Sequence, residues 1–480
     1  MANDRWLAFL DFCRGGLLSL VLLVALEMPA LALQESTAEP SVPSESEIKD
    51  KIAALDQKIM LHVIELARFN LHYHGGVNQK NFSQEWLYPM QREAGTALNF
   101  TNTVIDIGER ARGFSNLARI SESAQRSAVT CALTGQAITG TSSAVELLQN
   151  LRQTVIANRR GYSPSRSVAE VQAIDHTIAD LLDKRKQLMA KVPFGDEDRL
   201  YSLQGRLLEH LRNQLIFEFK NWSVSSRSQE WSENTFYALD SAQGYLQMSA
   251  SCLVLKGFRV SGTGGNAAIL NLVANGIVVF NPLFKHEAGR LIAARQRKHL
   301  DKIFPLGRPQ NIDSVLAEYD YTPEAKTAGG VEAVGEEKEL AFLIRESAAL
   351  DGPLDREVET VLRLRRIADQ QAISGPLIGL SGVTRSLMNT IAYYQISRRL
   401  SESARHSKLV ANRLNLAGRI VQSTGQTYSL YDTASTEVRH YRFKRALQKA
   451  GNLPKQRLQR RLDALDKSEK RIKASQLEGW

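Results

Sequence analysis

The chain has 480 residues, of which 43% are hydrophobic and only 13 are proline, and its formal net charge is +10. This length allows about two to four domains, and the hydrophobic fraction is sufficient for a packed core. The sequence contains neither an HExxH nor a GxSxG motif, which excludes the metalloprotease and hydrolase classes that these motifs define. We therefore predict no catalytic residue, no metal site and no cofactor.

The first 45 residues predict export. Residues 17–26 form a short apolar core, and Ala30-Leu31-Ala32 is a small-x-small cleavage site, so residues 1–32 are predicted to be a secretory signal. An uncleaved membrane anchor is the alternative. Residues 33–45 are polar and contain two prolines, which indicates a disordered tether. The expected location is the periplasm or the cell envelope.

Apolar residues at helical spacing organise the rest of the chain. Residues 46–195 form a first predicted helical repeat, with helices over 46–70, 83–125, 142–158 and 166–191. Residues 196–305 form a second repeat. Its helices are expected to run from a cap at Asp196 to Phe219, from Ser228 or Ser232 onward, and over 266–300.

Residues 306–335 contain two prolines and four glycines and are the predicted linker. Residues 336–425 form a third predicted repeat, whose last helix is expected to end at Ser423-Thr424-Gly425. Residues 426–480 are two predicted basic helices, separated by Gly451-Asn452-Leu453-Pro454. Because no run of alternating strand residues occurs, we predict an all-α fold of long antiparallel helices. It is expected to form an elongated bundle or coiled-coil-like assembly.

Three Ser/Thr-Gly dipeptides, which we call steps, suggest that the repeat is about 120 residues long. They are Thr139-Gly140, Ser261-Gly262 and Ser381-Gly382. Gly140, Gly262 and Gly382 lie 122 and 120 residues apart, each in a span without charge: 127–145, 260–284 and 370–384. Glycine adopts backbone angles that other residues avoid, so it can end one helix and start the next. The steps are therefore predicted to be buried tips or crossings of helix hairpins. The alternative is three unrelated turns.

Two cysteines of the predicted mature chain, Cys131 and Cys252, lie at similar positions before the first two steps. In an oxidising compartment they could form one disulfide. Two buried thiols that serve as small apolar residues are the alternative.

The positive charge is concentrated at the C-terminus. Residues 437–480 contain 13 lysines and arginines against five acidic residues, a net charge of +8. In an exported protein such a tail is expected to meet an anionic membrane surface or an acidic partner rather than nucleic acid. The alternative is a solvated helix. The candidate binding residues are Arg439, Arg442, Lys444, Arg445, Arg457, Arg460 and Arg461.

The uncharged run at 260–284 is long enough to span a bilayer, and the uncharged run at 241–255 precedes it. Together they resemble a membrane-inserting hairpin over 241–284. Asparagines at 266, 271, 275 and 281 argue against insertion, because amides are costly in lipid unless they are partnered. A buried central helix of a soluble bundle is therefore the favoured explanation of the 260–284 run, and insertion is the alternative.

These features predict an exported, non-enzymatic helical scaffold or adaptor of the cell envelope that binds a protein partner or an anionic surface. A membrane-active protein that inserts the 241–284 hairpin is the first alternative. An enzyme with a dispersed site is the second.

Overall fold

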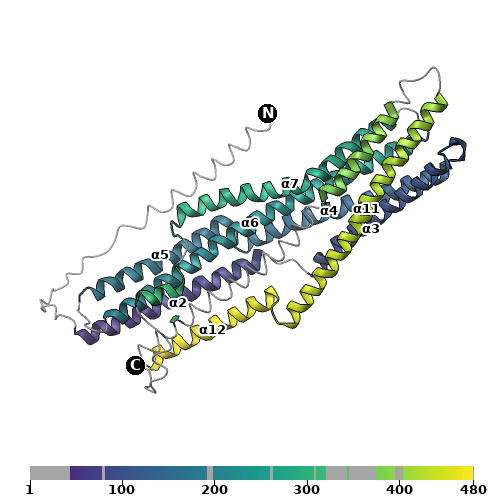
Figure 1. Ribbon diagram of the computed structural model, residues 1–480. Coiled ribbons are helices and arrows are strands. Elements are labelled where there is room, and N and C mark those ends of the chain that lie inside the picture. The colour runs from purple at the N-terminus through teal and green to yellow at the C-terminus, as the bar shows by residue number, and fades with distance from the viewer. Residues whose placement is uncertain are drawn as a thin grey trace, which may run out of the picture. The chain divides into compact units, whose positions relative to one another are not determined.

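The structure of the chain is a computed structural model (Figure 1). It describes residues 44–77, 82–191, 198–259, 263–307, 310–319, 343–344, 375–394 and 404–478. Helices supply all the regular structure of these residues, and none of them lies in a strand. The prediction of an all-α fold with bundle-like packing is confirmed.

The described residues include nine α-helices and one short 3-10 helix with the bounds given below, and residues 375–394 are helical as well. Their bounds are α2 Glu45–Val77, α3 Phe82–Arg112, η1 Leu117–Arg119, α4 Glu122–Arg159, α5 Pro164–Met189, α6 Asp198–Gly257, α7 Gly264–Ile303, α8 Ile312–Glu318, α11 Ala404–Lys449 and α12 Pro454–Glu478.

The chain divides into two compact units, Met1–Lys49 and Asp50–Trp480. The described part of the first unit is residues 44–49, which begin α2, and there the Ser44 hydroxyl accepts a hydrogen bond from the Glu47 amide at 3.3 Å. The predicted signal and nearly all of the predicted tether lie outside the described residues. Every contact below lies within the second unit.

Glycine and proline define two of the helix ends. Gly161 follows α4 with a φ of 94°, a left-handed conformation that favours glycine, and Pro164 opens α5 three residues later. Gly451 has a φ of 65° between α11 and Pro454, the first residue of α12. The predicted separation of two basic C-terminal helices is therefore observed.

One part of the second unit has a conventional apolar core between α2, α5, α8 and the first half of α6. Side chains recur at helical spacing on the facing sides of these helices, and most are fully buried. The core includes Ile59, Val63, Leu66, Val171, Ile178, Leu203, Leu207, Leu211, Leu215, Phe219 and Leu316.

A buried ion pair joins α2 to α5 within this part. Arg185 donates to both carboxylate oxygens of Asp56, from Nε at 2.6 Å and from Nη2 at 3.1 Å, and Nη2 also donates to the Tyr201 carbonyl at 2.9 Å. Burial raises the pKa of the Asp56 carboxyl, and the attraction of Arg185 opposes this shift. The buried guanidinium thus has a counter-ion, Asp56, and its N–H groups donate to Asp56 and to the Tyr201 carbonyl.

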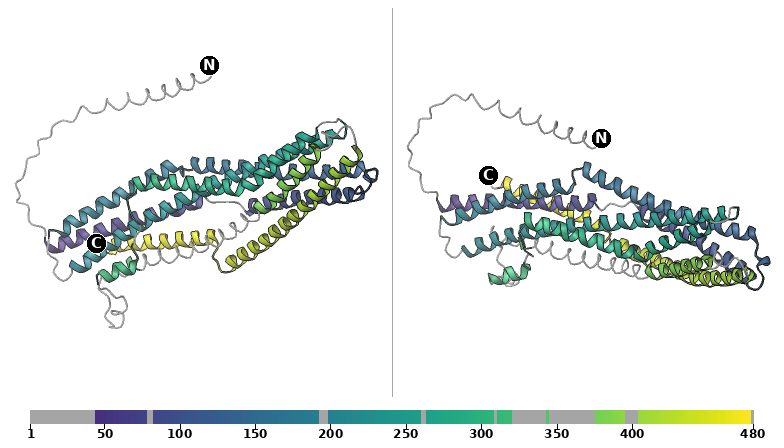
Figure 2. Two further views of the ribbon diagram at one scale, coloured as in Figure 1. Left: turned by 45° about the horizontal axis from the view of Figure 1, so that its top comes forward. Right: turned by 90° about the horizontal axis from the view of Figure 1, so that it is seen from above.

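The other part is a set of helices that we name the six-helix ring, because each contacts the next and the last returns to the first. Figures 1 and 2 show long helices of this part running side by side. Neighbouring helices are antiparallel, as predicted. Between α7 and the 375–394 helix, for example, the contacts are Asn275–Ser386, Val279–Gly379 and Pro282–Gly375. In order, the ring comprises α3, α4, residues 226–257 of α6, 264–290 of α7, 375–394, and 404–433 of α11.

The predicted helix breaks at two of the glycine steps are wrong. Gly140 lies inside α4 and Gly382 lies inside the 375–394 helix, because a glycine within a long helix is held there by the packing of its neighbours. Gly262 lies outside the described residues, between the end of α6 at Gly257 and the start of α7 at Gly264. The repeat of about 120 residues is not confirmed.

Three other predicted boundaries are also wrong. The second helix ends at Arg112 rather than near residue 125, and α6 runs through Ser228 and Ser232 without a new start. Gly425 does not end α11, since it packs against Ser381 inside a continuous helix. Most of the predicted linker at 306–335 lies outside the described residues.

Candidate interaction surface

The interior of the six-helix ring is polar or small. In the described part of the ring, the buried apolar side chains are Ala128, Ala132, Ala250, Ala267, Ala268, Ala274, Ala392 and Ala411. The buried polar ones include Asn102, Thr103, Asp106, Gln136, Ser142, Ser143, Asn150, Asp240, Ser251, Asn275, Asn281, Ser386, Asn412 and Arg419. A soluble bundle places its large apolar residues inside, so this part of the molecule reverses the usual pattern.

Glycines let the helices of the ring approach closely. A Cβ on Gly244 of α6 would lie 2.5 Å from the Cα of Gly140 in α4, and a Cβ on Gly135 would lie 2.6 Å from the Gly95 carbonyl oxygen of α3. Neither position has room for a side chain. The step glycine Gly140 is therefore a point of helix crossing, which is one of the two roles predicted for it.

Asn275 connects three helices of the ring. Its Nδ2 donates to the Ser386 hydroxyl at 2.9 Å, and its Oδ1 accepts from Gln247 of α6 at 3.3 Å. The step glycine Gly382 packs directly on the Asn275 side chain, where a Cβ would lie 2.8 Å from the amide carbon. The step at Gly382 is thus also a crossing point, between the 375–394 helix and α7.

A buried charge cluster joins α3 to α11 at another level of the ring. Asp106 accepts a hydrogen bond from Arg110 Nε at 3.0 Å and pairs with Arg419. Asn412 of α11 donates to the Arg110 carbonyl at 3.0 Å. Arg110 and Arg419 both pair with the Asp106 carboxylate. The cluster therefore links α3 to α11, and its charged groups lie inside the ring.

Large apolar side chains lie on the outside of the ring. The exposed ones in the described residues are confined to the ring helices and the segments that continue them, and α2, α5, α8 and α12 carry none. The densest group, which we name the α7 apolar surface, lies on α7 and the adjacent 375–394 helix, and each member is 46–55% exposed. Its members are Ile269, Val273, Phe280, Leu283, Phe284, Leu377, Leu380, Leu387, Ile391 and Tyr394.

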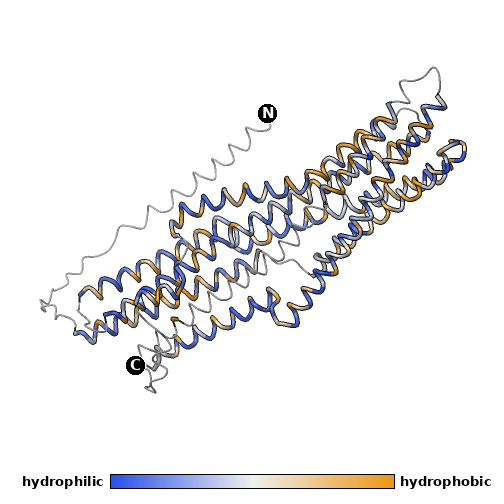
Figure 3. The backbone as a smooth tube through the Cα atoms, in the orientation of Figure 1, coloured by the Kyte–Doolittle hydropathy of each residue, from blue (hydrophilic) through white to orange (hydrophobic). Residues whose placement is uncertain are grey.

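Figure 3 shows that α12 is mostly hydrophilic and that α7 carries many hydrophobic residues. Among the described helices, α7 alone is long and apolar enough to cross a membrane. Its most apolar window of 18 residues has a mean hydropathy of 1.8, and 28% of that window is buried. The central helix of a soluble bundle would be mostly buried, so that explanation of the 260–284 run does not fit this degree of exposure.

The predicted basic residues do not gather into one site. They divide between α11 and α12, and some are engaged internally: Arg461 donates to the buried Glu218 of α6 at 3.3 Å. The exposed members are Arg439, Arg442, Arg445 and Arg460, and the half-buried members are Lys444, Arg457 and Arg461.

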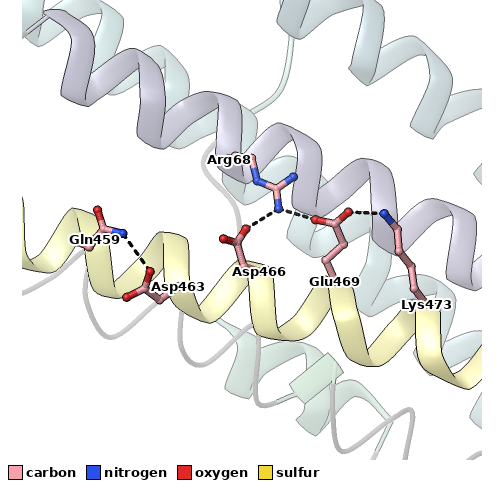
Figure 4. Close-up of polar contacts among 6 residues, drawn as sticks. All are labelled: Arg68, Gln459, Asp463, Asp466, Glu469 and Lys473. Carbon is pink, nitrogen blue, oxygen red and sulfur yellow. Dashed lines mark hydrogen bonds and ion pairs between the residues drawn. The ribbon is translucent and has the colours of Figure 1, made fainter.

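Ion pairs join α12 to α2 (Figure 4). Arg68 of α2 donates to Asp466 at 2.8 Å and also to Glu469, while Lys473 donates to Glu469 at 2.6 Å. The hydrogen bonds from Lys473 and Arg68 lower the pKa of the Glu469 carboxyl from 4.5 to about 2. Acidic residues of the basic tail thus attach α12 to the rest of the molecule.

The two predicted cysteines are not bonded to each other. Cys131 of α4 is a half-buried thiol and Cys252 of α6 is an exposed one. The alternative of two buried thiols therefore fits Cys131 better than Cys252.

No group of histidine, cysteine or acidic side chains in the described residues could hold a metal ion. His74 stacks on Trp222 with ring centroids 4.5 Å apart, and His62 pairs with Glu65 at 3.0 Å. A shallow groove between α2 and α5 is lined by four lysines together with aliphatic and amide side chains: Lys51, Ala54, Leu55, Lys58, Lys184, Gln187, Leu188 and Lys191.

The polar interior of the ring has a signal in the sequence. Gln136, Gly140 and Ser143 are spaced four and three residues apart, as helix periodicity requires. A polar and small stripe of this kind within an otherwise apolar, uncharged run indicates a helix whose polar face is buried. Amides in such a run therefore indicate contacts between helices as well as the free-energy cost of placing an amide in lipid.

Comparisons of the chain with protein-family models, with curated proteins and with solved structures give no match.

Proposed function

We propose that the protein is an exported, non-enzymatic helical scaffold or adaptor of the cell envelope, which binds its partner through the α7 apolar surface. The observation that carries this proposal is the size and continuity of that surface, which extends over two adjacent antiparallel helices. Contiguous exposed apolar patches mark interaction sites, because water contact with so much apolar area is unfavourable.

Two further features support a scaffold. The apolar core and the Asp56–Arg185 pair fix α2, α5 and α6 together, which provides a rigid support at a distance along α6 from the apolar surface. The exposed arginines of α11 and α12 offer a separate contact for an anionic membrane surface.

Photo-crosslinking in intact cells tests the interaction. A benzophenone amino acid is placed at Val273 on the α7 apolar surface or, as a control, at the exposed Gln172 of α5. We expect crosslinks to a partner, lipid or protein, from position 273 and none from position 172. Absence of crosslinks from position 273 would remove the proposed role of this surface.

Export has its own test. N-terminal sequencing of the protein from the envelope fraction is expected to begin at Leu33, after cleavage at Ala32. Recovery of an intact N-terminus would favour the uncleaved anchor, and recovery from the cytosol alone would contradict the proposed location.

A further inference from the structure

We infer that the α7 apolar surface contacts the hydrocarbon core of a lipid bilayer. This inference rests on the proposed function, since it requires that this surface is where the protein binds its partner. It names the partner by its chemistry: acyl chains rather than the apolar face of another protein.

The first argument is the composition of the ring interior. A bundle that folds in water needs large apolar side chains inside, because their burial drives the folding. Here the buried apolar side chains of the described ring are alanines, while its leucine, isoleucine and phenylalanine side chains are half-buried or exposed. In a bilayer the driving force changes, and helices associate through small residues and interhelical hydrogen bonds.

The second argument is the kind of contact between the helices. Gly140 and Gly244 bring two backbones together, and Asn275 bonds across to Ser386. Both contacts are of the kinds that stabilise helix pairs in lipid. Docking of another protein on the outer surface would not by itself require small residues and hydrogen bonds between the helices inside the ring.

The third argument is length and register. The uncharged part of α7, residues 264–284, corresponds to about 32 Å of helix at about 1.5 Å per residue, against a hydrocarbon core of about 30 Å. The antiparallel contacts Asn275–Ser386 and Pro282–Gly375 align the apolar residues of the two helices at the same levels. The two helices therefore present one continuous apolar band.

Two polar groups of this band, Asn275 and Arg385, are directed away from its outer surface, whereas Asn266 in the first turn of α7 is exposed. Asn275 Nδ2 donates to the Asn271 carbonyl and to Ser386, so its amide is partnered within the ring. Arg385, the one charged residue of the 375–394 helix, lies on the side that packs on α11, where its Cα is 3.3 Å from a Cβ built on Gly418. Tyr394 lies at one end of the band, as interfacial tyrosines do.

This arrangement also changes the hairpin that the sequence suggested. Ser241, Gly244 and Ser251 are buried against the other ring helices. The lipid-facing pair is therefore α7 with the 375–394 helix, and the 241–255 segment of α6 is the other neighbour of α7 in the ring.

Lipid contact is tested by fluorescence quenching in the full chain. A bimane label is attached at Val273→Cys or Leu387→Cys, or at Gln172→Cys as the control, in a background whose three cysteines are serine. The protein is reconstituted into phosphatidylcholine vesicles with or without doxyl-labelled acyl chains. Because the nitroxides sit inside the hydrocarbon core of about 30 Å, we expect about two-fold quenching at positions 273 and 387 and none at 172. Circular dichroism checks that each labelled variant is folded.

The other outcomes separate this inference from the proposed function. If labels at 273 and 387 escape lipid quenching but are shielded from aqueous iodide by self-association or by a protein partner, the bilayer is excluded and a binding surface remains. If iodide quenches both labels as strongly as the control, with vesicles and without, both the bilayer contact and the proposed function are overturned.

Discussion

Gly140 of α4 and Gly244 of α6 pack backbone against backbone. A Cβ on Gly244 would lie 2.5 Å from the Gly140 Cα and 2.8 Å from its nitrogen. Since both atoms belong to a helix backbone, neither can move aside as a flexible side chain would. The crossing of α4 and α6 therefore depends on glycine at position 244, while a Cβ on Gly140 would make a tight contact of 3.3 Å with the Gly244 Cα.

We predict that Gly244→Ala destabilises the protein, because the added methyl group must separate the two helices. Overpacking of this kind costs about 1–3 kcal/mol. The matched control is Gly108→Ala in α3, where a Cβ would meet nothing within 4 Å and where alanine should stabilise the helix by about 0.5–1 kcal/mol. Chemical denaturation followed by circular dichroism measures both changes. Equal shifts in the two variants would contradict the role of this crossing.

The buried Asp56–Arg185 pair gives a second prediction. Asp56→Ala leaves the guanidinium buried without its counter-ion, and breaking such a pair costs about 3–5 kcal/mol. The double variant Asp56→Leu with Arg185→Met removes both charges and is expected to cost much less, since apolar residues of similar volume can fill the site. Denaturation midpoints of the single and double variants decide between these outcomes. A double variant as unstable as the single one would show that packing, not the unpaired charge, sets the cost.

The helix content of this chain was accessible from its sequence because long amphipathic patterns record which face is buried. Val168, Val171, Ile174 and Ile178 recur at helical spacing, and α5 buries all four residues against the apolar core. Glycine misled the interpretation at Gly140 and Gly382, because a glycine that ends a helix and a glycine that admits a neighbouring helix have the same local sequence. The two roles are distinguished only by the residue that the glycine contacts on the neighbouring helix, which is Gly244 for Gly140 and Asn275 for Gly382.

The candidate surface was harder to predict for a related reason. The sequence shows that 260–284 is uncharged, but it does not show which side of the helix faces outward. That depends on contacts far along the chain, such as the one between Asn275 and Ser386, which are 111 residues apart. The net charge of the basic tail predicts contact with an anionic surface. Acidic residues within the tail, Asp466 and Glu469, instead make its contact with Arg68.

The attachment of α12 to α2 is predicted to weaken in acid. The pKa of Glu469 is about 2 in the folded protein, below its ordinary value of 4.5. The attachment that this carboxylate provides is therefore complete above pH 4.5 and is lost as the pH falls toward 2. Energy transfer between fluorophores on α2 and α12 should decrease over this range.

Two variants test the origin of that pH dependence. Glu469→Gln should remove the dependence by keeping the side chain neutral at every pH, while Arg68 and Asp466 remain. Asp463→Asn is the control, because Asp463 accepts a hydrogen bond from Gln459 of the same helix. A pH profile that persists in Glu469→Gln would assign the effect to another group.

The absence of a bond between Cys131 and Cys252 gives a fourth prediction. Alkylation of the denatured, unreduced protein is expected to modify both residues, because both are thiols in the folded structure. Peptide mass spectrometry identifies the modified residues. A cysteine pair recovered as one disulfide-linked peptide would instead support the covalent link between α4 and α6.

The hydrogen bond from Asn275 to Ser386 is predicted to couple α7 to the 375–394 helix. Ser386→Ala removes the acceptor at 2.9 Å and should cost about 0.5–1.5 kcal/mol, the net value of one hydrogen bond. Thr384→Ala is the control, since its hydroxyl donates to the Leu380 carbonyl within the same helix. A double-mutant cycle with Asn275→Ala separates the pair from the loss of either side chain. Coupling energies between polar residues in membrane helices average about 0.6 kcal/mol, so a coupling near zero would mean that glycine contacts alone hold these two helices together.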